Sequence, residues 1–119
     1  MKFEQALAQL IVEERLSTGL ATILTWALDN YLGFLALKRI GKDNERIRLK
    51  DLPFEDFIYL LKFYVLWLYV PGLGHKRLRE LRLAVMRFID DHGYDYDFPF
   101  IEEAVGRRIS RGSPYRRIW

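Results

Sequence analysis

The sequence predicts an all-α fold, an antiparallel bundle of four main helices with a short fifth helix. Apolar residues recur at spacings of three and four along most of the chain, as in helices buried on one side. No segment alternates polar and apolar residues over the length of a strand. Half of the 119 residues are hydrophobic and 15% are aromatic, which suffices for one packed core.

The chain shows no internal repeat and no linker that would divide it into domains. We therefore expect a single helical domain over residues 1–109 and a basic C-terminal tail over residues 110–119. The absence of cysteine excludes disulfides and thiolate metal sites, and it agrees with a cytoplasmic protein. Residues 18–37 are nearly apolar, but Asp29 and Asn30 interrupt them, so we expect a buried helix there and no membrane span.

The first two helices are expected at Lys2–Leu16 and Gly19–Ile40. Ser17 lies between them, where its side chain can cap the second helix. The second helix is apolar on nearly every face, so it should be central. Gly41 should end it, and a charged loop follows over residues 42–52.

The third helix is expected at Pro53–Tyr69, because proline suits the first helical position. A glycine-rich turn over residues 71–74 ends it. The fourth helix should run from His75 to Asp91, with Gly93 terminating it. Its core stripe is formed by Leu78, Leu81, Val85 and Phe88. A short fifth helix is expected at Pro99–Ile109.

The end of the fourth helix carries residue types that can cleave RNA without a metal: Arg87, His92 and Tyr94. Histidine can move protons near neutral pH, and the planar fork of arginine can hold a phosphate as its charge grows. Five residues along a continuous helix are about 140° apart. We therefore expect Arg87 and His92 to share a cleft if the helix ends before His92.

This spacing resembles the motif of HEPN-domain ribonucleases, in particular HepT-like toxins of HEPN–nucleotidyltransferase toxin–antitoxin pairs. The resemblance continues, in order, over three further segments: "ALDNYLGFLALKRIG" (27–41), "LKDLPFEDFIYLL" (49–61) and "YDYDFPFIEEAVGRRI" (94–109). One residue departs from the family pattern. The position after the arginine is usually polar in the family, most often asparagine, and here it is Phe88.

The resemblance implies a metal-independent endoribonuclease toxin that needs no cofactor and acts as a homodimer, with two motifs facing a shared cleft. It implies that His92 is the general acid or base and that Arg87 holds the scissile phosphate of the RNA. Tyr94 would orient the site. It would also be the residue that a cognate nucleotidyltransferase antitoxin modifies, and a bulky anionic adduct there would block the cleft.

A second interpretation is a non-catalytic nucleic-acid-binding module. "VPGLGHKRLREL" (Val70–Leu81) resembles a helix-hairpin-helix turn, whose glycines and free amides can hold a phosphate. Its departure is Leu78, where the motif usually has a small residue. The same segment is also typical of a plain connector between helices. A purely structural helical protein is a third interpretation.

The net charge is only +3, but the basic residues are clustered. One cluster is Lys76, Arg77, Arg79 and Arg82, and the other is in the C-terminal segment, with Arg107, Arg108 and Arg111 as its candidate contacts. Both could follow a phosphate backbone or form a solvated surface.

Metal sites fit the sequence poorly. Asp91, Asp95, Asp97 and Glu102 have calcium-loop spacing, but Gly93 and Tyr96 occupy positions that need an oxygen ligand and a glycine. Zinc would have only the two histidines and no cysteine. We therefore expect no metal.

Overall fold

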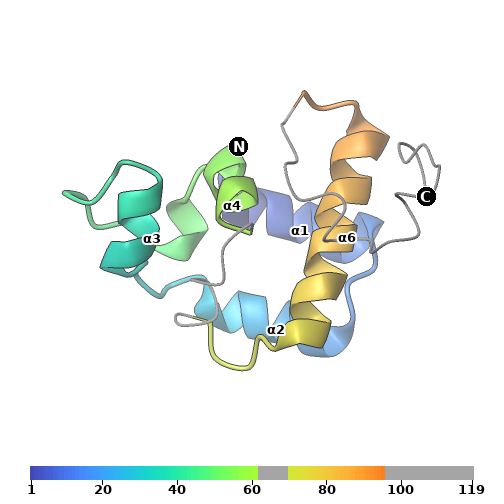
Figure 1. Cartoon of the computed structure of the whole chain (residues 1–119). Coiled ribbons are helices and arrows are strands. Elements are labelled where there is room, and N and C mark those ends of the chain that lie inside the picture. Colours follow the sequence, from blue (N-terminus) through green and yellow to red (C-terminus); the bar gives the residue numbers. More distant parts are fainter. Residues whose placement is uncertain (62–69, 96–119) are drawn as a thin grey trace.

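The computed structural model describes residues 1–61 and 70–95, and over these ranges the chain is all-α, with isolated β-bridges but no strand (Figure 1). The elements are α1 (Phe3–Glu13), α2 (Thr18–Ala27), α3 (Phe34–Arg39), the 3₁₀ helix η1 (Leu49–Asp51), α4 (Phe54–Leu60) and α6 (His75–His92). Within these ranges no helix has the length and apolar character needed to cross a bilayer. Residues 62–69 of the expected third helix, the fifth helix and the basic tail lie outside the described residues.

The first helix forms as predicted and is fixed at its N-terminus by the segment before α4. The Phe3 amide donates to the Leu52 carbonyl at 2.8 Å, and the Phe54 amide donates to the Met1 carbonyl at 2.8 Å. The Phe3 ring stacks on that of Phe57, with centroids 4.0 Å apart. These contacts bury one face of α1, which consists of Phe3, Ala6, Leu7 and Leu10.

The prediction of a single helix over residues 19–40 is wrong, because this stretch forms two separate helices, α2 and α3. Residues 28–32 leave the helix and pair instead with residues 47–50: the Leu32 amide donates to Ile47, and the Lys50 amide donates to Leu28. The Asp29 carboxylate lies 3.1 Å from Lys50 Nζ. The charged segment expected as a free loop therefore has a structural role. It supplies the backbone partners that replace helical hydrogen bonds.

The predicted cap and the predicted fourth helix are confirmed. Ser17 Oγ accepts from the Leu20 amide at 3.3 Å and so caps α2. Glu80 of α6 accepts from both the amide and the hydroxyl of Ser17, at 2.7 and 2.8 Å, which joins α6 to the start of α2. At its other end α6 stops at Gly93, whose φ of 66° suits glycine.

Arg82 does not belong to the basic surface that the sequence predicts. Arg82 is a residue of α6 whose side chain is buried. Its Nε and Nη2 both donate to the Leu61 carbonyl at the end of α4. A buried guanidinium is kept in place by such hydrogen bonds and is not available to a phosphate. Arg82 therefore has a structural role in joining α6 to α4.

Candidate active site

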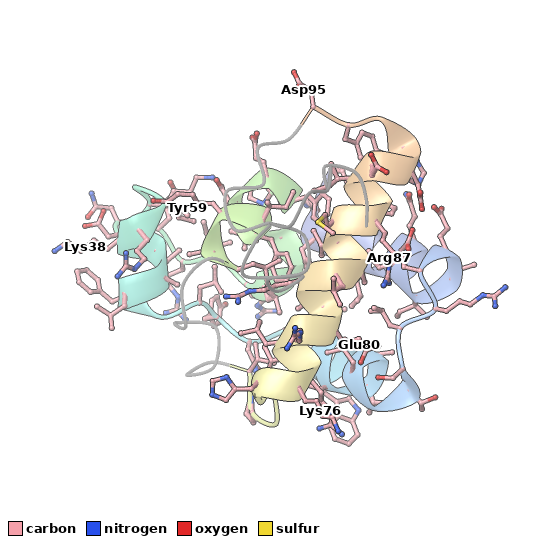
Figure 2. The ribbon with its side chains drawn as sticks, turned by 45° about the vertical axis from the view of Figure 1, so that its right-hand side comes forward. Lys38, Tyr59, Lys76, Glu80, Arg87 and Asp95 are labelled. Atoms are coloured by element: carbon pink, nitrogen blue, oxygen red, sulfur yellow. The ribbon has the colours of Figure 1, made fainter. Side chains whose placement is uncertain are left out.

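The end of α6 places Arg87 and His92 next to the end of α1, although not in the way predicted. Helix α6 continues through His92, so the condition for a shared cleft is not met, and the two side chains stay on different faces. The structure brings them to successive residues at the C-terminal end of α1, Glu13 and its C-cap Glu14. His92 contacts Glu13, and Arg87 lies close enough to Glu14 to influence its pKa. Figure 2 shows Arg87 on the side of α6 that faces α1.

The His92 imidazole is held on three sides. Its Nε2 lies 2.5 Å from Glu13 Oε1. Its ring packs on Phe88, with centroids 4.5 Å apart, and lies nearly parallel to Tyr94, with centroids 5.1 Å apart and an interplanar angle of 7°. Its side chain is 31% exposed. A carboxylate on one ring nitrogen fixes the orientation of the ring, while the exposed part can meet a ligand.

A second acid–base group is formed by Glu14 and Asp91, the residues next in sequence to Glu13 and His92. The Glu14 carboxyl is partly buried and shares a hydrogen bond with the Asp91 carboxyl. Burial, this hydrogen bond and the Asp91 charge raise the pKa of Glu14 from 4.5 to about 7, with a smaller contribution from Glu13 and an opposing one from Arg87. The Glu14–Asp91 pair therefore holds a proton up to neutral pH.

This proton has a consequence for stability. Because the folded state binds it more tightly than the unfolded chain, the free energy of unfolding should fall as pH rises from 4.5 to about 7. Glu14→Gln keeps a donor for Asp91 and removes the titration. It should match wild type near pH 4.5 and, since Glu14 is only partly buried, exceed it by about 1 kcal/mol above pH 7.

Thermal unfolding followed by circular dichroism across this pH range checks the prediction, with about 4 °C expected between variant and wild type at the alkaline end. Glu4→Gln, which removes an exposed carboxylate from the first turn of α1, is the matched control. Parallel pH profiles for Glu14→Gln and wild type would contradict the assigned proton.

Phe88, the residue after Arg87, is part of the hydrophobic core. Its side chain is fully buried, and its ring meets that of Phe54 edge to face, with centroids 5.8 Å apart. The ring also supports His92 and Tyr94 from beneath. Phe88, where HEPN ribonucleases usually have a polar residue, is thus a core residue in this chain, and its ring also contacts His92 and Tyr94.

Lys76 and Arg77, which the sequence predicts to contact nucleic acid, differ in the structure: Arg77 stabilises the turn before α6. Arg77 Nη1 donates to the Gly72 carbonyl at 3.2 Å, and its guanidinium packs against Gly19, 3.0 Å from where a Cβ would lie. Lys76 is exposed (Figure 2), and Leu78 is buried. Arg77 is exposed as well, but its hydrogen bond to Gly72 fixes it to the turn. The other predicted contacts, Arg107, Arg108 and Arg111, lie outside the described residues.

Sequence analysis did not find Glu13, Glu14 or the role of Asp91. One signal was present: two adjacent acids end α1, although negative charge is unfavourable at a helix C-terminus. Such a pair calls for compensating contacts: Glu13 meets the His92 ring, and Glu14 shares a hydrogen bond with Asp91 near Arg87.

In the described ranges, no group of three or more carboxylate or histidine side chains is arranged to hold a metal ion. Comparisons with family models, with curated proteins and with solved structures gave no match.

Proposed function

We propose that this protein is a metal-independent endoribonuclease whose active site is formed by the ends of α1 and α6. The observation that carries the proposal is the held imidazole of His92, which Glu13 orients from one side and two aromatic rings support from the others. A positioned imidazole that can transfer a proton, together with an arginine that can hold a phosphate, is the minimum that cleavage of a phosphodiester requires.

The reaction needs no group beyond those of the chain and the RNA. The 2′-oxygen attacks phosphorus and loses its proton to a base, and the 5′-oxygen leaves with a proton from an acid. The products are a 2′,3′-cyclic phosphate and a 5′-hydroxyl. His92 serves at one of these two oxygens. The protonated Glu14–Asp91 pair is the complementary group, and Arg87 beside it holds the phosphate.

The resemblance over residues 27–109 extends the proposal to a HEPN-like bundle, a homodimer with a shared cleft, and a toxin paired with a nucleotidyltransferase antitoxin. The position of Tyr94 supports this regulation. Its ring lies along that of His92, so a nucleotide joined to its phenol oxygen would place bulk and negative charge beside the imidazole.

Incubation of RNA with the protein in EDTA tests the proposal. Arg87→Ala should slow cleavage about 100-fold, because the phosphate loses its fixed cation. Arg79→Ala removes an exposed arginine two turns earlier on α6 and is the matched control, expected to cleave at the wild-type rate. Intact RNA with wild type, or equal rates for wild type and Arg87→Ala, would overturn the proposal.

A second candidate is the non-catalytic nucleic-acid-binding module. It is favoured by the first turn of α6, which contains Lys76 and Arg77, no acid and no side-chain cap. Positive side chains at a helix N-terminus oppose the helix dipole and suit a bound anion. This candidate expects salt-dependent binding without cleavage, so the EDTA assay separates the two.

A further inference from the structure

The α3 end of the molecule exposes apolar side chains that the core does not use. Phe34 and Leu35 are 58% and 51% exposed, whereas Ala36 and Leu37 of the same short helix are buried. Tyr31, just before α3, is 43% exposed. These three exposed side chains lie within five consecutive positions of the chain.

Cations lie over both aromatic rings. The guanidinium carbons of Arg46 and Arg48 are 4.3 and 5.0 Å from the centroid of the Tyr31 ring, and Arg48 Nη2 donates to the Tyr31 hydroxyl at 3.2 Å. Lys38 Nζ lies 5.8 Å from the centroid of Phe34. Hydrogen bonding from Arg48, and its charge, lower the pKa of Tyr31.

The arrangement is held by the backbone rather than by the side chains alone. Tyr31 and Arg48 face each other in an isolated antiparallel bridge, flanked by the hydrogen bonds that join residues 28–32 to residues 47–50. Asp29 supports the same segment, with its carboxylate 3.8 Å from Arg48 Nη1. The guanidinium groups are therefore partly ordered before any ligand arrives, which reduces the entropy lost on binding.

The charge of this region matches that of a nucleic acid. Residues 26–50 contain six cations against three acids, a net +3 that equals the net charge of the whole chain. Lysine is depleted in the centres of protein–protein interfaces, whereas cations among exposed aromatic rings are typical of surfaces that bind single strands.

We infer that Tyr31, Phe34, Lys38, Arg46 and Arg48 form a binding surface for single-stranded RNA, here named the α3 surface. Phosphates accept hydrogen bonds from the guanidinium edges, and bases stack on Phe34 and on the planes of the arginines. In Figure 2 Lys38 lies at the α3 end of the molecule and Arg87 lies on the side of α6 away from it, so the α3 surface is separate from the candidate active site and does not depend on it.

Fluorescence anisotropy with a labelled 2′-O-methyl oligouridylate measures this binding in the full chain without cleavage, since the probe has no free 2′-hydroxyl. Arg46→Ala with Arg48→Ala should weaken binding about tenfold and lower the slope of log affinity against log salt by about 1.4, the loss of two phosphate contacts. Phe34→Ala should weaken binding about fivefold with an unchanged slope.

Lys76→Ala with Arg79→Ala is the matched control, because it removes the same charge from exposed positions on α6, outside the α3 surface. An equal or larger loss in this control would overturn the inference, since binding would then follow net charge or the α6 turn. Unchanged affinity in both Arg46→Ala with Arg48→Ala and Phe34→Ala would also overturn it. So would altered self-association of Phe34→Ala in sedimentation with unchanged RNA affinity, which would assign the surface to a second copy of the chain.

Discussion

Phe88→Asn is expected to cost about 5 kcal/mol of unfolding free energy, enough to unfold much of the protein at 37 °C. The substitution removes a fully buried ring from its edge-to-face contact with Phe54. It also places an amide in the buried apolar cluster that contains Phe54, where burial without a hydrogen bond adds its own penalty. Urea denaturation at neutral pH measures the difference.

Phe88→Leu is the control, since it retains apolar volume and should cost about 1.5 kcal/mol. If Phe88→Asn lay within 1 kcal/mol of wild type, the position would not be core, and the asparagine usual in the HEPN family would be compatible with this chain. A loss of about 5 kcal/mol would instead show that the fold of this chain requires phenylalanine at this position, so any RNA cleavage must occur with Phe88 in place of the usual asparagine.

The helical periodicity predicted α6 and half of its buried residues correctly, because one apolar stripe, formed by Leu78, Leu81, Val85 and Phe88, determines both. Arg82 lies on that stripe, four residues after Leu78 and three before Val85. The signal for its burial was therefore in the spacing. It was missed because a charged residue among other charged residues is usually on the surface.

The break between α2 and α3 could not be predicted in the same way. Asp29 and Asn30 interrupt the apolar run, but a helix tolerates two polar residues when one face is exposed. What stops the helix is a set of hydrogen bonds from residues 47–50, almost twenty positions later. Periodicity within a segment carries no information about such a distant partner.

For the candidate site, the sequence predicted the residues on and after α6 but not the acids that contact them. Arg87, His92 and Tyr94 come from one stretch of sequence, so their spacing could be recognised. Glu13 is separated from His92 by 79 positions, and only the packing of α1 against α6 brings the two together. The acids that orient and complement the imidazole therefore become visible only in the folded chain.

His92→Ala is expected to lower the rate of RNA cleavage by about 100- to 10,000-fold, the range that a positioned general acid or base contributes. The loss should appear in single-turnover measurements with saturating protein, because the substitution removes proton transfer and leaves Arg87 and the α3 surface in place. His92→Gln should be as inactive, since its amide can bond to Glu13 but cannot exchange a proton near neutral pH.

Loss of activity alone would not separate chemistry from structure, because His92 also joins α6 to Glu13 of α1 and packs on Phe88. Added imidazole makes the separation. It should restore part of the activity of His92→Ala, since it can enter the space left by the side chain and carry the proton, and it should not restore Arg87→Ala.

Glu13→Ala is the structural control, because it breaks the same contact between the helices and keeps the imidazole. If His92 had a purely structural role, Glu13→Ala and His92→Ala would lose equal activity, and imidazole would rescue neither. Rescue confined to His92→Ala would assign the proton transfer to this side chain, and its absence, with melting temperatures unchanged, would contradict the assignment.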